Sequence, residues 1–218
     1  MDALARYYAQ RAPEYERIYQ KPERQAALRT LREFVAQTFA GRRVLEIACG
    51  TGWWTEILSN TARYVLATDI NDEVLSIART KPFGDATISF QRCDAFQLEQ
   101  AAGSFDAALA VFWWSHLTRP ELEQFLQTLH RRLEPESIVV FIDNIFVPGS
   151  STPISRRDEE GNTYQQRRLD DGSTTEVLKN FPTDEGITRV LHGSARELTI
   201  SRSQYFWTVR YSPFPPGK

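Results

Sequence analysis

In the first two thirds of the chain, segments with helical spacing of hydrophobic residues alternate with short apolar runs typical of strands. Leu28, Leu31 and Val35 recur at spacings of three and four, which predicts an amphipathic helix over residues 23–39. A short β-branched run at residues 43–47 follows and predicts a buried strand. This alternation is typical of a sheet whose strands are connected through helices.

The alternation continues as far as residue 142. A break at residues 50–52, Gly-Thr-Gly, separates the first strand from a helix that begins at Trp53. Asn71 can cap the next helix, and Thr118 with Glu121 forms a capping box before a later one. Further strands are predicted over residues 64–68, 88–92, 105–111 and 138–142.

Beyond Pro148 the chain becomes polar and the period becomes alternating. Residues 164–169 and 174–178 flank the turn sequence Asp-Asp-Gly-Ser and predict an antiparallel hairpin. A last strand is expected within residues 196–211. Alternating strands and helices with an antiparallel ending indicate the α/β fold class, with an open sheet and a mixed edge.

Composition and charge restrict the function classes. The 218 residues include 26 basic and 28 acidic side chains and are 41% hydrophobic, which favours one compact domain over a disordered chain. The net charge of -2 provides no general attraction to nucleic acid or anionic lipid. Only two cysteines, and an N-terminus without the apolar core of a secretory signal, favour a reducing compartment. We expect a cytoplasmic monomer or homodimer that binds neither nucleic acid nor membranes.

Several residues directly after the predicted strands can bind a nucleotide. In open α/β sheets ligands bind at the carboxyl ends of the strands. Gly50 and Gly52 let the backbone approach a ligand, and the following helix directs free N–H groups toward an anion. Asp69 can accept hydrogen bonds from both hydroxyls of a ribose. Asp94 can accept one from an exocyclic amine, with Phe96 covering an aromatic base.

A nicotinamide dinucleotide is the first alternative for this ligand. Its fingerprint G-x-G-x-x-G/A would run from Gly50 through Gly52 to Thr55, where the third small residue is missing. The stretch Val44–Gly52, V-L-E-I-A-C-G-T-G, instead has an acidic residue followed by A-x-G-x-G. This stretch resembles the first motif of the class I S-adenosylmethionine-dependent methyltransferases, with alanine at Ala48 in place of the usual first glycine.

The later motifs of that family match at the expected intervals. They are Asp69, Asp94-Ala95 and the stretch F-D-A-A at residues 105–108, and the resemblance covers about residues 40–145. It implies a Rossmann-like, doubly wound, seven-stranded mixed sheet with an antiparallel last strand. It also implies S-adenosylmethionine (SAM) as methyl donor, S-adenosylhomocysteine (SAH) as product, and no metal. Residues 162–181 are similar to small stand-alone bacterial methyltransferases of mostly unassigned substrate.

The resemblance also implies roles for single residues. Glu46 would face the methionine end of the cofactor, Asp69 would hold the ribose, and Asp94 with Ala95 would contact the adenine. The full set of cofactor-binding residues expected is Tyr8, Tyr15, Glu46, Ala48, Gly50, Gly52, Trp54, Asp69, Ile70, Asp94, Ala95 and Phe112.

Two residues at strand ends are the candidates for catalysis. His116 follows the fourth strand and is the best candidate for a general base, and the alternative is that it caps or packs against the next helix. Asp143 and Asn144 follow the fifth strand and can orient an acceptor, or can form a turn. The expected substrate-binding residues are Tyr19, Trp113, Asn144, Tyr164, Arg167 and Lys179.

Aromatic and basic residues around this edge have two interpretations each. Tyr8, Tyr15 and Tyr19 would share one helical face, either over the cofactor or as plain packing. Of the adjacent Trp113 and Trp114, one is expected in the core. The basic residues of the hairpin, Arg167, Arg168 and Lys179, can bind an anionic substrate, although a solvated face is the simpler interpretation.

These observations favour a single methyltransferase domain over residues 1–218. Its expected parts are an N-terminal helical cover (1–39), a cofactor-binding core (40–145) and an acceptor-side hairpin with C-terminal strands (146–218). The expected function is methyl transfer to an oxygen or nitrogen of a small molecule, since no separate recruiting module is expected. A nucleic-acid methyltransferase and a catalytically silent SAM-binding module are the alternatives.

Overall fold

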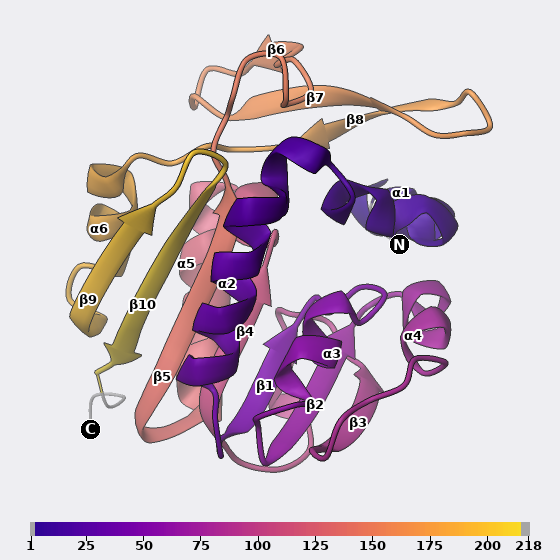
Figure 1. Ribbon diagram of the computed structural model, residues 1–218. Helices are drawn as coiled ribbons and strands as arrows, with labels where there is room; N and C mark the ends of the chain where they lie inside the picture. Colours follow the sequence, from indigo (N-terminus) through magenta and orange to yellow (C-terminus); the bar gives the residue numbers. More distant parts are fainter. Residues whose placement is uncertain (1–2, 215–218) are drawn as a thin grey trace.

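The computed structural model describes residues 3–214, and its centre is a seven-stranded sheet with the order β3-β2-β1-β4-β5-β10-β9 (Figure 1). Strands β1 to β5 pair in parallel, whereas β10 is antiparallel to both β5 and β9. The predicted α/β class and the antiparallel last strand are therefore confirmed. The strands are β1 (Arg43–Ile47), β2 (Tyr64–Asp69), β3 (Thr87–Arg92), β4 (Phe105–Val111), β5 (Leu133–Asn144), β9 (Ala195–Arg202) and β10 (Phe206–Pro213).

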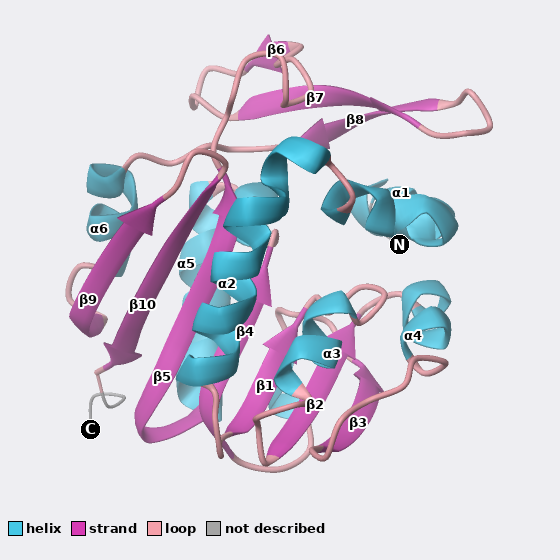
Figure 2. Cartoon of the chain, viewed as in Figure 1, coloured by secondary structure: helices cyan, strands magenta, loops and turns pink. Residues whose placement is uncertain are grey.

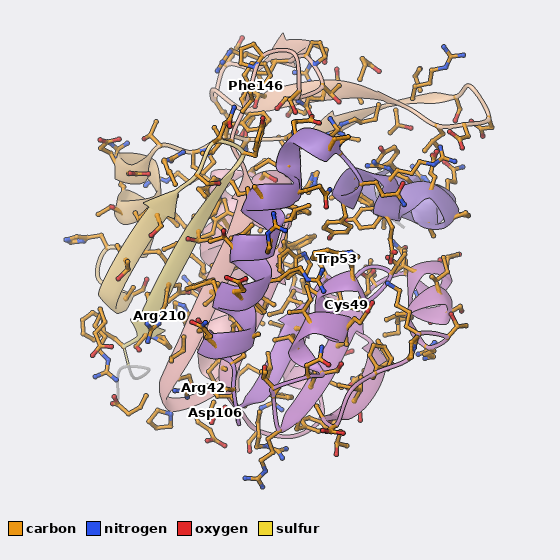
Figure 3. All side chains as sticks on the ribbon, viewed as in Figure 1. Arg42, Cys49, Trp53, Asp106, Phe146 and Arg210 are labelled. Atoms are coloured by element: carbon orange, nitrogen blue, oxygen red, sulfur yellow. The ribbon has the colours of Figure 1, made fainter. Side chains whose placement is uncertain are left out.

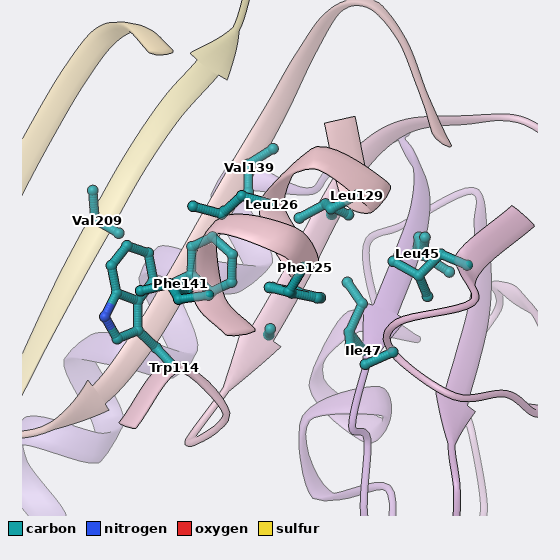
Figure 4. Packing of buried hydrophobic residues seen from close by; sticks show 14 of the residues in the cluster. Leu45, Ile47, Trp114, Phe125, Leu126, Leu129, Val139, Phe141 and Val209 are labelled. Atoms are coloured by element: carbon teal, nitrogen blue, oxygen red, sulfur yellow. The ribbon is translucent and has the colours of Figure 1, made fainter. Parts of the chain in front are cut away.

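Helices cover both faces of this sheet (Figure 2). Helices α2 (Gln25–Thr38), α3 (Trp53–Leu58) and α4 (Asp72–Ala78) pack on one face, and α5 (Arg119–Arg132) with α6 (Asp184–Leu191) on the other. Successive strand residues point to opposite faces, so Val44 packs with the α2 side and Leu45 with the α5 side. Figure 4 shows the α5 side, where Phe125 packs against Phe141. The result is a three-layer α/β/α core.

Some local predictions are wrong. The single strand expected within residues 196–211 is two strands, because the chain turns at residues 203–205 and Ser203 pairs with Phe206 through its backbone N–H and hydroxyl. Asn71 stands at the N-cap position of α4, but its side chain makes no capping hydrogen bond. The capping box of Thr118 and Glu121 is confirmed.

A second layer of structure lies over the carboxyl ends of β1 to β5 (Figure 1). It contains α1 (Ala3–Arg11), the 3-10 helices η1 (Ala12–Tyr19) and η2 (Pro22–Arg24), and a small sheet of β6 (Arg156–Arg157), β7 (Thr163–Arg168) and β8 (Thr174–Leu178). The two other 3-10 helices described are η3 (Leu98–Gln100) and η4 (Trp114–His116).

The predicted hairpin is confirmed, because β7 and β8 pair in antiparallel fashion. The single helical face expected for the tyrosines is wrong, because the chain changes from α1 to η1 near Pro13.

Ion pairs and hydrogen bonds hold the N-terminal segment between the core and the hairpin. The Thr51 hydroxyl donates to Glu16 at 2.7 Å, which attaches η1 to the glycine loop. Arg17 pairs with Asp170 at 2.8 Å, which attaches η1 to the hairpin turn. These contacts enclose the space above the sheet.

The two ends of the sheet differ in what they present (Figure 3). At the amino ends of β1 and β4, Arg42 pairs with Asp106 at 3.8 Å. Cys49 and Trp53 mark the opposite end, where the glycine loop and the N-terminal segment meet. No helix within residues 3–214 is long and apolar enough to cross a membrane.

Candidate active site

Two cavities lie above the carboxyl ends of the parallel strands. The larger, of about 250 Å³, is bordered by α1 and by the ends of β1 to β4. The smaller, of about 90 Å³, lies among η1, η2, the end of β5 and the hairpin. A single bound water requires only about 10–15 Å³, so each cavity is large enough for a ligand bigger than water. Four residues, Tyr8, Tyr15, Phe112 and His116, line both cavities and form the wall that they share.

The acidic side chains of the larger cavity are Asp69 and Asp94, and both accept hydrogen bonds from backbone N–H groups. Asp69 accepts from the N–H of Gly50 at 2.9 Å through one oxygen and from that of Asn71 at 3.0 Å through the other. Asp94 accepts from the N–H of Phe96 at 2.9 Å. Each carboxylate oxygen can accept further bonds, so these side chains are fixed and still able to bind hydroxyl or amino groups.

The loop between β1 and α3 follows an unusual backbone path. Ala48, Gly50 and Gly52 all have left-handed φ angles, of 53°, 57° and 79°. A Cβ atom added to Gly50 would meet the Tyr15 ring at 3.6 Å, and one added to Gly52 would lie 3.0 Å from the Cβ of Ala78. Gly50 therefore keeps space below Tyr15, whereas Gly52 lets α3 pack closely against α4.

Ala48 provides a test of this backbone path. A left-handed conformation costs an L-residue about 1–2 kcal/mol, and glycine loses about 0.4–1 kcal/mol through its greater freedom in the unfolded chain. Ala48→Gly is therefore expected to raise the free energy of unfolding by about 0.5–1 kcal/mol, measured by urea denaturation. Ala26→Gly in the exposed part of α2 is the control and should destabilise the protein. A destabilised Ala48→Gly variant would show that the strain is relieved in another way.

His116 lies at the shared wall and is neutral. Its Nδ1 lies 2.7 Å from the carbonyl oxygen of Leu178, so Nδ1 carries the proton and donates it. Nε2 consequently accepts from the Tyr8 hydroxyl at 2.8 Å. Burial, together with the nearby Lys179 charge, lowers the pKa of His116 to about 3. The ring has the position expected of a base, but its basicity is low.

Asp143 belongs to a buried polar cluster behind this wall. Lys179 donates to it at 2.9 Å, and the backbone N–H and hydroxyl of Ser115 donate at 3.0 and 2.7 Å. Burial alone would raise the pKa of Asp143, but the charge of Lys179 holds it below its usual value. Asp143 therefore fixes Lys179, which lines the smaller cavity, and does not line either cavity itself.

Phe112 is the most strained residue of the shared wall. Its φ of 59° places a bulky residue in the left-handed region, which costs about 1–3 kcal/mol. Its ring stacks between Tyr19 and Phe206, with centroids 5.9 Å from each. Surrounding aromatic packing thus holds Phe112 between the two cavities.

Most of the residues expected from the sequence lie together. The larger cavity is lined by Tyr8, Tyr15, Ala48, Gly50, Asp69, Ile70, Asp94, Ala95, Phe112 and also Trp113. The smaller cavity is lined by Asn144, Arg167 and Lys179. As expected, Trp114 enters the core, where it packs against Phe141 and Trp207.

Six of the expected residues line neither cavity: Glu46, Gly52, Trp54, Tyr19, Tyr164 and Asp143. Glu46 lies below the loop and accepts from the Thr55 hydroxyl at 2.6 Å, and burial raises its pKa to about 8. Tyr19 stacks on Trp53, with ring centroids 4.1 Å apart, and Trp54 packs beside them. The Tyr164 hydroxyl donates to Asp158 on the outer side of the hairpin.

Other lining residues were missed. In the larger cavity these are Leu4, Ala5, Asn71, Val74, Cys93 and Val111. In the smaller cavity they are Arg11, Ile18, Lys21, Arg24, Ser150, Ser151, Thr152, Gln165 and Phe181. For Arg11, Lys21 and Arg24, the available signal in the sequence was their position among the N-terminal tyrosines. Their convergence depends on contacts between residues far apart in the sequence, such as that of Arg24 with Asn144 at the end of β5, 120 residues away.

Comparison with known proteins indicates the type of protein to which this chain is similar. Residues 44–136 match the methyltransferase domain family. A demethylmenaquinone methyltransferase of Clavibacter sepedonicus is 30% identical over 118 residues, which are 54% of this chain and 46% of that protein. A ubiquinone biosynthesis O-methyltransferase of Sinorhizobium medicae is 28% identical over 119 residues, 48% of each chain. The chain thus spans about half the length of these curated relatives.

Solved structures match over nearly the whole chain. DhpI in complex with SAM and HEP has a TM-score of 0.79 and 26% identity, covering 97% of this chain and 96% of that chain. DhpI in complex with SAH has a TM-score of 0.77 and 25% identity, covering 98% and 97%. Together with the sheet order and the loop motif, these matches support a methyltransferase domain over residues 44–136 within the fold of the class I S-adenosylmethionine-dependent methyltransferases.

Proposed function

We propose that this protein binds SAM in the larger cavity and transfers its methyl group to an oxygen or nitrogen of a small molecule in the smaller cavity. The observation that carries this proposal is the wall of Tyr8, Tyr15, Phe112 and His116, which borders both cavities. Shared lining residues mean that the two cavities adjoin, so their ligands can be aligned for in-line transfer, and alignment alone contributes roughly 7–11 kcal/mol in favourable cases.

The residues of the larger cavity fit this cofactor. Asp69 is positioned to accept from ribose hydroxyls, Asp94 to accept from the adenine amine, and Gly50 to leave room for the chain between them. Trp113 and Phe96 add aromatic surface for a base. When bound, SAM supplies a methyl group that is already activated on a sulfonium. The protein's residues then have to hold the acceptor close and exclude water.

The three expected parts of the chain contribute differently to this proposal. Residues 40–145 supply most of the larger cavity. The N-terminal cover (1–39) and the acceptor side (146–218) supply most of the smaller one. Acceptor choice therefore depends on the parts outside the matched methyltransferase domain. A cytoplasmic location and a monomeric or homodimeric state stay predictions.

Calorimetry with SAM, followed by an assay for SAH release, tests the proposal. The acceptor panel contains small alcohols, phenols, amines, carboxylates and phosphonates. We expect SAM binding and turnover with at least one small acceptor. SAM binding without any turnover would favour the silent binding module, and no SAM binding would contradict the proposal. A salt-sensitive RNA gel shift would favour the nucleic-acid methyltransferase instead.

The protonation of His116 is a separate prediction. Because its pKa is lowered to about 3, its NMR ring resonances should not shift between pH 5 and 8, where free histidine titrates near 6.5. The His116→Gln variant assigns the resonances. The unfolded chain binds this proton near pH 6.5, whereas the folded chain binds it only near pH 3. The free energy of unfolding should therefore decrease as the pH falls from about 6.5 toward 3. Titration with a midpoint near 6.5 would identify His116 as an ordinary base.

A further inference from the structure

The smaller cavity is lined by five basic side chains. Arg11 comes from α1, Lys21 and Arg24 from the η1–η2 region, Arg167 from β7 and Lys179 from the chain after β8. No aspartate or glutamate is among its lining residues within the described chain. Five cations from separate segments of the chain therefore face one small space.

These cations have few acidic partners. Within residues 3–214, Lys179 pairs with Asp143 at 2.9 Å, and no carboxylate lies within 4 Å of the other four. Glu23 is exposed, and its negative charge partly compensates the positive charges of Lys21 and Arg24. Most of the positive charge of the cavity is not balanced by the protein.

Neutral groups hold these cations in place. Lys21 donates to the carbonyl oxygen of Ser150 at 2.6 Å, and Arg24 donates to Asn144 at 3.0 Å. Arg167 donates to the side-chain oxygen of Gln165 at 2.5 Å, and its buried Nε has no partner in the described chain. Burial lowers the pKa of Lys21, Arg24 and Lys179, and the charge of Arg167 lowers each of them further. An anion in the cavity would stabilise the whole group.

The shared wall restricts what kind of nucleophile can react. A neutral alcohol or a protonated amine must lose its proton when it is methylated, and this requires a base. Of the two ring nitrogens of His116, Nε2 carries the lone pair, and it already accepts a hydrogen bond from the Tyr8 hydroxyl. Its low basicity makes it a poor acceptor for such a proton. A nucleophile that arrives already deprotonated needs no base.

We propose that the acceptor is a small oxyanion, a carboxylate or phosphonate, which the cations of the smaller cavity bind and whose charged oxygen takes the methyl group. This inference rests on the proposed function and specifies its substrate class. A lone pair of the oxyanion forms the new O–C bond as the bond from carbon to the sulfonium sulfur breaks. The electron pair of that bond stays on sulfur, giving the neutral thioether SAH and a methyl ester. One negative and one positive charge disappear together, and no proton is released.

Acceptors with a single type of nucleophile test this inference on the wild-type chain. Propionate, benzoate, methylphosphonate and phenylphosphonate are compared with 1-propanol, phenol and propylamine. SAH release is measured, and mass spectrometry identifies the product. We expect methyl esters from the oxyanions and no product from the neutral or amine acceptors.

Arg167 and its neighbour Arg168 provide matched variants. Arg167→Gln should raise KM for the oxyanion by about tenfold or more, because it removes a charged donor pair, while the Kd for SAM changes less than threefold. Arg167→Lys should recover part of the loss, since it restores the charge without the planar fork. Arg168 is exposed and lines neither cavity, so Arg168→Gln should behave as wild type. Thermal unfolding checks that each variant is folded.

The outcomes separate this inference from the proposed function. If SAM binds and only alcohols, phenols or amines are methylated, the oxyanion inference is wrong and the proposed function stands. If SAM binds but no oxyanion at 10 mM is turned over, and calorimetry detects no oxyanion binding, the inference is also wrong. Equal KM values for the folded Arg167→Gln and Arg168→Gln variants would remove Arg167 from the site. Failure of SAM to bind the wild-type chain contradicts the proposed function itself.

Discussion

Replacing Asp69 with alanine is expected to weaken the binding of SAM by about 10²-fold or more. The carboxylate lines the larger cavity and holds the N–H groups of Gly50 and Asn71. Hydrogen bonds to charged groups contribute about 1.5–3 kcal/mol each, and two lost bonds to ribose hydroxyls therefore exceed the roughly 2.8 kcal/mol that corresponds to 10²-fold. Isothermal titration calorimetry with SAM measures the change.

Asp72 is the matched control for Asp69. It lies three residues further along the chain and is exposed, and its ion-pair partner within residues 3–214 is the exposed Arg92, at 3.6 Å. Asp72→Ala should change the Kd for SAM less than twofold. Asp69→Asn keeps one accepting oxygen and should fall between the alanine variant and wild type. If Asp69→Ala is folded and binds SAM as tightly as Asp72→Ala does, the cofactor does not occupy the larger cavity in the proposed way.

Replacing Asp143 with alanine is expected to lower the free energy of unfolding by about 3–5 kcal/mol. The carboxylate is fully buried and Lys179 is 3% exposed, so the change leaves an ammonium group without its counter-charge in the interior. For a domain of this size, about 2–4 °C of melting temperature corresponds to each kcal/mol, so a decrease of about 6–20 °C is expected. Differential scanning calorimetry provides the measurement.

Two further variants test the cause of this loss. Asp85→Ala removes an exposed carboxylate that makes no ion pair in the described chain, and it should change stability by less than about 0.5 kcal/mol. Asp143→Leu combined with Lys179→Met removes both charges, and it should be more stable than Asp143→Ala alone because no buried charge is left unpaired. A double variant that is less stable than Asp143→Ala would show that packing around Ser115, and not charge, dominates.

The cluster of Asp143, Ser115 and Lys179 connects fold stability with the smaller cavity, where we propose that the acceptor binds. Ser115 belongs to η4, directly before His116, and Lys179 follows β8. Their hydrogen bonds fix the hairpin onto the end of β5. The same bonds keep one cation at the smaller cavity. Asp143→Ala should therefore impair turnover as well as folding, through loss of that attachment.

The core of the fold could be predicted because its signals are local. Residues 43–47 and 105–111 are short apolar runs bounded by loop residues, and the strands β1 and β4 have the same limits. The larger cavity was also predictable, since Asp69 ends β2, and Ala48, Gly50 and Asp94 lie within three residues of the end of β1 or β3. In a parallel sheet all such positions meet at one edge, whatever the remaining chain does.

Asp143 and Lys179 show where this reasoning fails. A polar pair after a strand predicted an orienting group or a turn, and a basic residue on a hairpin predicted a substrate-binding or a solvated side chain. Instead each satisfies the charge of the other in the interior. Burial of a charge depends on a partner 36 residues away, and no local pattern of either residue contains that information.

The sequence by itself determined the α/β class, the order of the core elements, the loop at residues 48–52 and the carboxylates of the larger cavity. These follow from periodicity and from the position of residues relative to their own strands. Only the tertiary structure decided that five cations meet in the smaller cavity, that His116 is neutral and bonded to Tyr8, and that Asp143 holds Lys179. The physical reason is that burial and charge neutralisation depend on side chains distant in sequence, which only the packing of the N-terminal segment and hairpin over the sheet brings together.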